Sequence, residues 1–330
     1  KGGCGVSNQD DTPWCRWGAT QDTTTTDAEE GHVGGLCTVT PETKSGPQIL
    51  QAFADLSIDA TAITSTKAVT ATAISGAATV TGAWVANQGV EVTSLVKTVT
   101  LNSDITTKAG HLTLTCKDNT NGGLVLAKAP GGTPQNIQAN ENLFIDAKDI
   151  TSKAAGVTAT ADTGTVTVTG AWAADQGVDV TSSEKTVTLN SDITTKAGHL
   201  TLTCKHNTDG GLALAKAAGE KNVQNIQAKT VLNIEAKYIT SVAHVTVVAD
   251  TKNVHITAAG GGITTAQATV VAATSIDVTG VWIASSHIAL TSTTASITLQ
   301  SDLKTAGATV LAHTAVTVVG AWEASSHIAL

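Results

Sequence analysis

One stretch of the chain, KTVTLNSDITTKAGHLTLTCK, occupies Lys97–Lys117 and again, without a substitution, Lys185–Lys205. An active site is normally built once, because its reacting groups converge on one substrate, whereas a scaffold of stacked units can reuse a unit freely. The start of the second copy follows the start of the first by 185 − 97 = 88 in the numbering. The repetition therefore indicates an architecture of stacked repeats before any chemistry is considered.

The tryptophans show the same interval, and their spacing also reveals a smaller unit. From Trp84 to Trp172 the interval is 172 − 84 = 88, and from Trp172 to Trp282 it is 282 − 172 = 110. The difference, 110 − 88 = 22, is one quarter of 88. The sequence therefore predicts an elementary unit of about 22 residues, with one extra unit before Trp282.

Within each unit, apolar and polar residues alternate as they do in β-strands. In GTVTVTGAW, Val166 and Val168 share one face, and the threonines beside them share the other. Turn sequences such as NTNGG, NTDGG and KAG separate the strands. Hydrophobic residues make up 41% of the chain but aromatic residues only 3%, so the core must consist mainly of small aliphatic side chains, which suit a sheet.

These features predict an all-β fold, a parallel β-helix (β-solenoid) of about 22 residues per rung. Strands of successive rungs would lie about 4.8 Å apart. Residues 49–330 are expected to form the solenoid repeat domain, and residues 1–48 a small Cys- and Gly-rich N-terminal cap.

The start of the solenoid has a pattern of its own. A first rung exposes apolar surface and unpaired strand edges, so something must cover it. Ile49, Leu50, Phe53 and Leu56 have helical spacing, which predicts a short capping helix at this point.

Three of the five cysteines, Cys4, Cys15 and Cys37, fall in the predicted cap. One disulfide among them would staple a segment too small to hold itself together. Zinc is the alternative, but the segment has no CxxC and only His32 nearby, so we favour the disulfide and expect no metal.

The other two cysteines, Cys116 and Cys204, end the two copies of LTLTC. Each follows the parity of the leucines before it, which places it on the inward face. Four rungs would separate the two sulfurs by roughly 19 Å, beyond the reach of a disulfide. We expect both to be buried, reduced thiols.

Strings such as NLFIDAKDITSKAAGVTATADTGTVTVTGAW resemble the repeats of filamentous-haemagglutinin and autotransporter-type adhesin passengers. The resemblance covers about Leu56–Leu330 and lies in the general style of the repeats, short alternating strands between Gly, Asn and Asp turns, and not in a specific motif. It implies a secreted, rod-shaped protein with a surface or matrix role.

Charge and chain start agree with a secreted protein. Charged residues make up 14% of the chain, the net charge of −8 is spread along it, and Arg16 is the only arginine. No nucleic-acid or anionic-membrane partner is therefore expected. No run of apolar residues is long enough to span a bilayer, and a start at Lys1 without Met is typical of a product whose leader has been removed.

Two turns could be taken for calcium loops. KDNTNGG places Asp118, Asn119 and Asn121 where KHNTDGG places Asn207 and Asp209. A calcium loop would need a closing bidentate Glu, which is missing, and Asn-Gly or Asp-Gly is an ordinary turn sequence. We therefore expect plain turns, with no metal and no cofactor.

A catalytic triad is the next possibility. His111 and His199 are equivalent, each with an upstream aspartate, Asp104 or Asp192. The sequence offers no strained nucleophile elbow or oxyanion hole, so exposed corner histidines are favoured. A polysaccharide-cleaving β-helix would need close carboxylates. The acidic residues that could serve are scattered: Asp146, Asp149 and Glu235.

Threonine ladders could instead order water and bind ice. A fixed step of one predicted unit moves Thr113 and Thr115 onto Gln135 and Ile137, so the ladder breaks. The threonines then fit outward strand positions with high β propensity.

The GAW and GVW strings leave one alternative open. Strict alternation packs their tryptophans inward, whereas a glycine bulge would turn them outward, where they could contact a sugar or a neighbouring molecule. The candidate surface or partner-contact residues are Trp84, Trp172, Trp282 and Trp322.

These observations favour an extracellular structural or adhesive protein that is not an enzyme. SSHIAL recurs at Ser325–Leu330, where the sequence stops in mid-pattern, which predicts head-to-tail self-association into filaments. Extracellular glycans or a cell surface are further expected partners. The alternatives are a carbohydrate-binding or carbohydrate-cleaving β-helix and, less favoured, an ice-binding protein.

Overall fold

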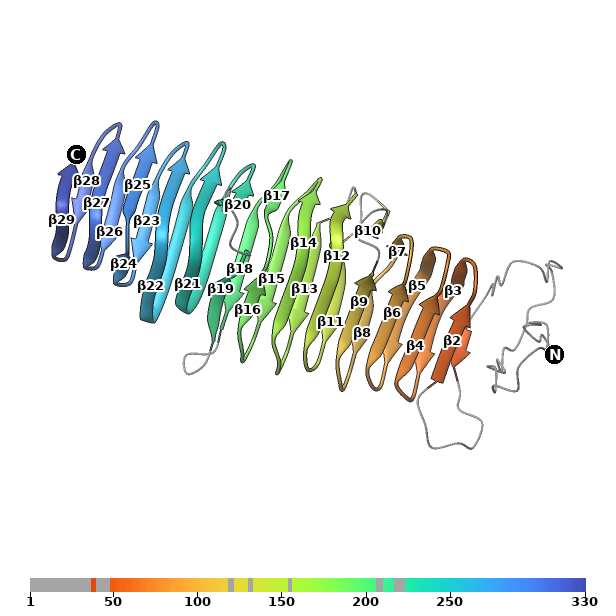
Figure 1. The fold of residues 1–330 in the computed structure, drawn as a ribbon. Helices are drawn as coiled ribbons and strands as arrows, with labels where there is room; N and C mark the ends of the chain where they lie inside the picture. The colour runs from red at the N-terminus through yellow and green to blue at the C-terminus, as the bar shows by residue number, and fades with distance from the viewer. Residues whose placement is uncertain are drawn as a thin grey trace, which may run out of the picture. The chain divides into compact units, whose positions relative to one another are not determined.

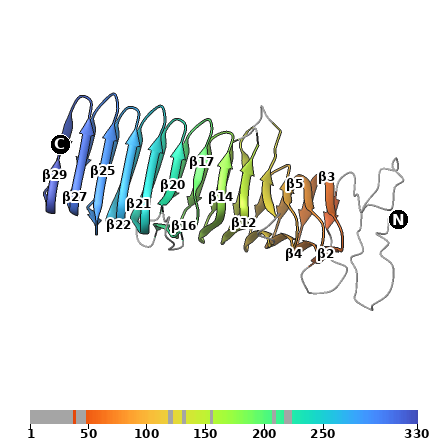
Figure 2. The ribbon, with the colours of Figure 1, turned by 45° about the horizontal axis from the view of Figure 1, so that its top comes forward.

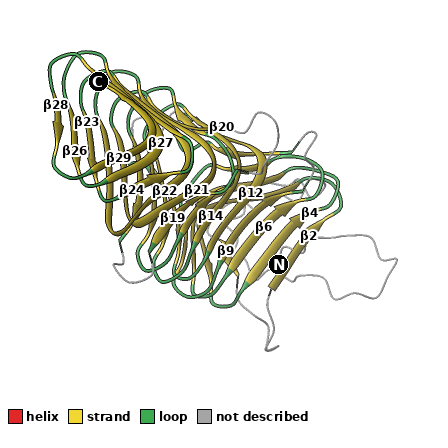
Figure 3. Cartoon of the chain, turned by 60° about the vertical axis from the view of Figure 1, so that its left-hand side comes forward, coloured by secondary structure: helices red, strands yellow, loops and turns green. Residues whose placement is uncertain are grey.

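The computed structural model describes residues 37–39, 48–117, 122–129, 133–153, 156–205, 210–216 and 223–330. Every regular element in these residues is a β-strand, and the strands pair in parallel (Figure 1 and Figure 3). The predicted all-β parallel solenoid is therefore confirmed. The described residues contain no helix that is long and apolar enough to cross a bilayer. The disulfide predicted among Cys4, Cys15 and Cys37 lies outside the side chains that the structure describes.

The chain forms two compact units, Lys1–Ala155 and Gly156–Leu330, called unit 1 and unit 2 below. In each unit the rungs stack three rows of strands, which form faces A, B and C in chain order. A long strand bends round a corner and contributes to more than one face. The domain boundary predicted at residue 48 stays a prediction.

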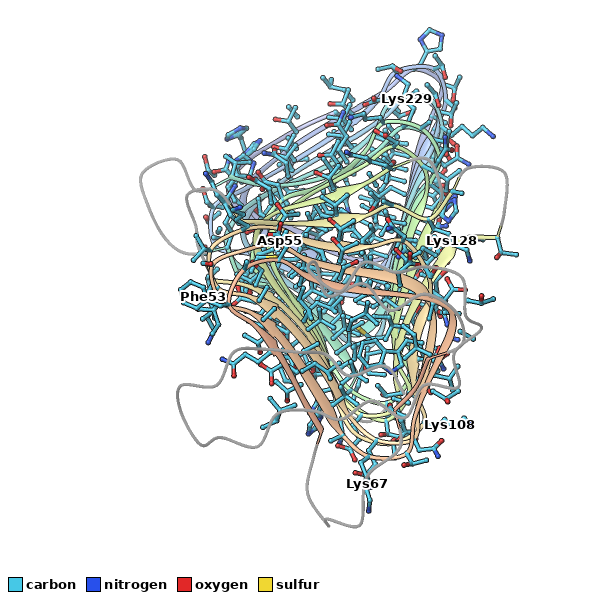
Figure 4. The ribbon with its side chains drawn as sticks, turned by 90° about the vertical axis from the view of Figure 1, so that its right-hand side faces the viewer. Phe53, Asp55, Lys67, Lys108, Lys128 and Lys229 are labelled. Atoms are coloured by element: carbon cyan, nitrogen blue, oxygen red, sulfur yellow. The ribbon has the colours of Figure 1, made fainter. Side chains whose placement is uncertain are left out.

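In unit 1, face A consists of β2, β4, β6, β9 and the start of β12. Face B consists of the starts of β3 and β5, then β7, β10 and the end of β12. Face C consists of β1, the ends of β3 and β5, then β8 and β11. Phe53, Lys67 and Lys128 mark the corners between A and B, C and A, and B and C (Figure 4). The strands are β1 (Cys37–Val39), β2 (Gln48–Ala52), β3 (Leu56–Ser65), β4 (Val69–Ala73), β5 (Ala78–Ala86), β6 (Val90–Ser94), β7 (Val99–Leu101), β8 (Ile105–Thr107), β9 (Leu112–Cys116), β10 (Gly123–Leu126), β11 (Gln135–Ala139) and β12 (Leu143–Ser152).

Unit 2 also has three faces, labelled A to C in its own chain order, and its later strands lie side by side in Figure 2. Face A consists of β13, β15, β18, the starts of β21 and β22, β23, β26 and β28. Face B begins with β14, β16 and β19 and ends with β24 and the starts of β27 and β29. Face C consists of the end of β14, β17, β20, the ends of β21 and β22, β25 and the ends of β27 and β29. The strands are β13 (Val157–Ala161), β14 (Val166–Ala174), β15 (Val178–Ser182), β16 (Val187–Leu189), β17 (Ile193–Thr195), β18 (Leu200–Cys204), β19 (Gly211–Leu214), β20 (Val223–Ala228), β21 (Leu232–Ala249), β22 (Val254–Ala272), β23 (Ile276–Thr279), β24 (Trp282–Ala284), β25 (His287–Ser292), β26 (Ile297–Gln300), β27 (Leu303–Ala312), β28 (Val316–Val318) and β29 (Trp322–Ala329).

The strand register gives the length of each rung. Val157 pairs with Val178, and Val178 with Leu200, so the numbering advances by 178 − 157 = 21 and then by 200 − 178 = 22. Leu200 pairs with Leu232, an advance of 232 − 200 = 32, because loops are inserted between the strands of that rung. The next partner is Val254, so four rungs advance the numbering by 254 − 157 = 97. The predicted rung length of about 22 residues is confirmed, but the interval of 88 does not correspond to four equal rungs.

The core is built from one aliphatic side chain stacked on the next. On face A of unit 1, Val90, Leu112 and Leu143 are partners in register, and their exposed fractions are 2%, 0% and 0%. Outward positions between them carry polar residues, as in Thr113 beside Leu112. The small branched and aliphatic residues of the sequence thus fill the interior at nearly every inward position.

The predicted capping helix at Ile49–Leu56 is wrong. Leu50 is buried, with 3% exposed, whereas Ile49 and Phe53 are 56% and 77% exposed, and Gln48–Ala52 forms strand β2. Leu50 pairs with Ala71 of β4. A helix at residues 49–56 could not pair with β4, so the backbone N–H and C=O groups on that edge of β4 would lose their partners. Four apolar residues in a short run fit a strand as well as a helix, and the tertiary partner decides between them.

The glycine two residues before each of four tryptophans makes a sharp bend. Its φ is positive, at 103° for Gly82, 112° for Gly170, 114° for Gly280 and 148° for Gly320. A Cβ on Gly82 would lie 1.8 Å from the carbonyl oxygen of Ala60 in the previous rung. Only glycine combines this conformation with so close an approach.

Candidate binding face

The tryptophans pack inward wherever a further rung covers them. Trp84, Trp172 and Trp282 are 1%, 2% and 4% exposed. The indole Nε1 of Trp84 donates to Oγ of Ser65 at 3.3 Å, and that of Trp282 donates to Oγ1 of Thr265 at 3.1 Å. Inward packing is therefore confirmed for these three, and their proposed role in surface or partner contact is wrong. The glycine bend preserves the strand alternation instead of reversing it.

The tryptophans also do not form one row. Within unit 2, Trp172 pairs with Ile193 on face C, whereas Trp282 pairs with Ile263 on face B. The interval of 110 between them therefore does not correspond to a whole number of rungs. Trp322, on β29, is partly exposed, and its indole Nε1 is buried with no hydrogen-bond partner.

Cys116 and Cys204 are buried free thiols, as predicted. Each sulfur donates to the carbonyl oxygen of a glycine in the same rung, Gly123 at 3.1 Å and Gly211 at 3.0 Å. Burial raises the pKa of both thiols to about 11. The two side chains therefore act as small apolar groups that also satisfy a carbonyl oxygen.

We expect both thiols to react slowly with a bulky maleimide in the native protein. The thiolate is the reactive form, and at pH 8 a pKa of about 11 instead of 9.0 lowers its fraction about 100-fold. Peptide mapping by mass spectrometry should find Cys116 and Cys204 unlabelled in native protein and labelled in denaturant. Rapid native labelling of either residue would contradict the burial.

The histidines and aspartates considered for a triad do not face each other. His111 Nε2 lies 3.3 Å from Glu141, and His199 Nε2 lies 3.0 Å from Asp179. The side chains of each pair are about half exposed, and both histidines lie at a corner of the rung, just before β9 and β18. These are surface ion pairs when the histidine is protonated, and such pairs add little stability.

Asp104 and its equivalent Asp192 instead hold the base of an inserted loop. The Nζ of Lys128 donates to both carboxylate oxygens of Asp104, at 2.9 and 3.0 Å (Lys128 is labelled in Figure 4). In unit 2 the Nζ of Lys216 donates to Asp192 at 2.8 Å. The two identical segments therefore make the same contact with two different loop sequences.

A buried glutamine lies beside each of these lysine–aspartate contacts and also holds the base of the loop. Gln135 and Gln224 are 1% and 0% exposed. The Nε2 of Gln224 donates to the carbonyl oxygens of Leu189 and Ser191 at 3.0 and 2.9 Å. Its Oε1 accepts from the amide of Lys216 at 3.3 Å, and Gln135 makes the matching contacts in unit 1. A fully satisfied amide at this point fixes where the loop leaves the sheet.

The other acidic candidates lie apart on the outer surface. Asp146 and Glu235 occupy equivalent outward positions, because they pair with Thr115 and Thr203 of the two copied segments. Asp149 is exposed near the next corner. The calcium-loop candidates Asp118, Asn119, Asn121, Asn207 and Asp209 lie outside the described residues. Within the described part of the chain, no three His, Cys, Asp or Glu side chains could jointly hold a metal ion.

The threonine test used the wrong register. Thr113 pairs with Phe144 and Thr115 with Asp146, a step of 144 − 113 = 31 in the numbering, because of the inserted loops. The conclusion for this face does not change, since neither partner is threonine. Only the structure shows which outward residues form columns.

One surface differs from the rest in its chemistry. On face C of unit 2, the ends of β21, β22, β25, β27 and β29 present outward side chains in columns, and none is Asp, Glu, Lys or Arg. We call this surface the uncharged face; its strands lie side by side in Figure 2. Its two central columns are Thr246, Thr269, Ala289, Thr309 and Ala329, and Val248, Val271, Thr291 and Leu311.

The other faces of unit 2 carry charge. Face A presents Asp179, Glu235 and the pair His255–Asp277, whose side chains are 3.1 Å apart. Face B presents the ion pair Lys304–Glu323 at 3.2 Å. The uncharged face therefore joins the 52% exposed Leu311 and the half-buried Val248 and Val271 to small hydroxyl groups. An exposed surface of this kind is typical of an interaction site.

Comparisons with protein-family models, with curated proteins and with solved structures gave no match. The resemblance to adhesin passengers thus extends to the β-solenoid fold and no further.

Proposed function

We propose that the chain is an extracellular structural and adhesive β-solenoid, whose copies associate through the uncharged face of unit 2. The observation that carries this proposal is that the uncharged face, on the ends of β21, β22, β25, β27 and β29, presents no Asp, Glu, Lys or Arg in a protein of net charge −8. Copies with the same net charge repel each other, so contact is favoured where both partners lack charge and expose aliphatic groups. Extracellular location, and contact with glycans or a cell surface, rest on the texture of the repeats.

The size of the surface predicts a weak contact. Five strands about 4.8 Å apart and five residues along each strand give roughly 24 by 17 Å, or about 400 Å² per copy. Two copies would bury about 800 Å², below the usual 1,200–2,000 Å² of stable complexes. Association should therefore appear only at high protein concentration or where many copies are held together.

Sedimentation equilibrium over a wide concentration range tests the proposal. Replacing Thr269 and Val271 of β22 by lysine puts two positive charges at the centre of the uncharged face. We expect the parent chain to associate at high concentration and this variant to remain monomeric, because like charges would oppose each other across the contact. A parent chain that is monomeric throughout would overturn the proposal.

A matched variant controls for the charge itself. Thr257→Lys and Thr279→Lys make the same change on face A of the same unit, at outward positions. This variant should associate like the parent. Equal behaviour of the two double variants would show that the uncharged face is not the contact. The head-to-tail filament stays a prediction, and association that survives both double variants would favour it.

The carbohydrate-binding and ice-binding alternatives also stay predictions. Binding of polysaccharide, or a lowered freezing point, that is lost in the Thr269→Lys, Val271→Lys variant while the parent stays monomeric would assign the face to one of them.

A further inference from the structure

The two copies of SSHIAL place two histidines over one glycine. His287 begins β25, His327 lies on β29, and β27 runs between them. Gly307 of β27 is the register partner of both histidines. The two Cα atoms are therefore two strand spacings apart, about 9.6 Å.

The imidazole rings lie closer together than the two Cα atoms. Their centroids are 5.8 Å apart, with an interplanar angle of 30°. A Cβ on Gly307 would lie 3.1 Å from Nδ1 of His287 and 3.1 Å from Cε1 of His327. Both rings therefore lean over the one position in the column that has no side chain.

We propose that His287 and His327 together bind one divalent transition-metal ion, such as Zn²⁺, Ni²⁺ or Cu²⁺, above Gly307. Neutral imidazole is a preferred ligand of these ions. His287 is half-buried and His327 is exposed, so rotation about their side-chain torsions can turn the two stacked rings until one nitrogen of each faces a shared ion. Water would fill the remaining positions.

The neighbouring contacts favour this arrangement. Oγ of Ser326 lies 3.1 Å from Nδ1 of His327, which leaves Nε2 of that ring for the metal. A polar partner on the second nitrogen fixes the ring of a metal-binding histidine. His255, by contrast, is already paired with Asp277 at 3.1 Å, and His199 with Asp179 at 3.0 Å.

The two histidines lie on the strand ends that form the uncharged face, but the site is complete within one chain, so metal binding can be measured on the monomer. Titration calorimetry of the full chain without a polyhistidine tag, at a concentration where it is monomeric, should show one Ni²⁺ bound per chain. Mg²⁺ should not bind, because it prefers oxygen ligands. His287→Ala and His327→Ala should each weaken Ni²⁺ binding roughly 100-fold, since only one imidazole then remains.

Two further variants make the test specific. Gly307→Val keeps both histidines but fills the space between their rings, and it should also abolish tight binding. His313→Ala removes an exposed histidine of the same unit and should leave binding unchanged. The thermal unfolding midpoint of each variant shows whether it is folded. Parent-like Ni²⁺ affinity in folded His287→Ala and His327→Ala, or equal losses in His313→Ala, would overturn the proposal.

Discussion

Replacing Trp84 by alanine is expected to lower the free energy of unfolding of unit 1 by about 3–5 kcal/mol. The side chain is 1% exposed and fills the space between Ile63 and Ile105, its register partners on face C. The change removes a large apolar group, leaves a cavity and deprives Ser65 of a hydrogen-bond partner. Urea unfolding followed by circular dichroism measures the loss.

Val85→Ala is the matched control for this substitution. Val85 is the next residue on β5, faces outward and is 36% exposed. Its replacement should cost less than about 1 kcal/mol, as surface changes usually do. Similar losses in the two variants would mean that Trp84 does not pack in the core.

Replacing Gly280 by alanine should be almost as damaging, with a loss of about 3 kcal/mol or more. Its φ of 114° is strained for any L side chain, and a Cβ would lie 2.5 Å from the carbonyl oxygen of Ala258. Because Ala258 belongs to the rung before, the backbone of two rungs must shift. The unfolding midpoint in urea should fall accordingly.

Gly260→Ala separates this effect from the general cost of changing glycine. Gly260 lies in the same unit, and the nearest atom to its added Cβ would be Cγ of Lys237 at 3.8 Å, an ordinary contact. Its φ is not in the left-handed range. We expect this variant to unfold within about 0.5 kcal/mol of the parent. If both glycine variants unfolded alike, the bend at Gly280 would not be strained by a side chain.

The fold could be predicted because its signal is local and repeated. Val166 and Val168 alternate with threonine, and the same alternation in every rung gives the inward and outward faces. The parity of Cys116 and Trp172 followed from the same rule, and both are buried. The segment at Ile49 failed because it is short, and its partner strand β4 decides its structure.

The candidate site could not be predicted, because it depends on register. Thr246 pairs with Thr269, a step of 269 − 246 = 23, whereas Thr269 pairs with Ala289, a step of 289 − 269 = 20. A constant step of the average rung length would place Thr246 beside Ala268, which is an inward residue. Small differences in corner length therefore hide the columns of the uncharged face from any regular count. The only part of this face that the sequence itself marks is the repeated SSHIAL string, which forms parts of β25 and β29.

The two copies of KTVTLNSDITTKAGHLTLTCK form matching strands, β7–β9 and β16–β18, with the same alternation of buried positions. The strand before each copy and the strand after it also keep equivalent partners, since Val90 and Val178 precede in register and Leu143 and Leu232 follow. Excising Lys97–Glu184 would join Val96 directly to the second copy at Lys185, with no new sequence at the junction and 330 − 88 = 242 residues left. A chain shortened in this way, or lengthened by a further copy of the same 88 residues, would therefore keep a register partner for the strands at the junction. The exact copy therefore allows the length of the stack to change while the sequence at the junction stays the same.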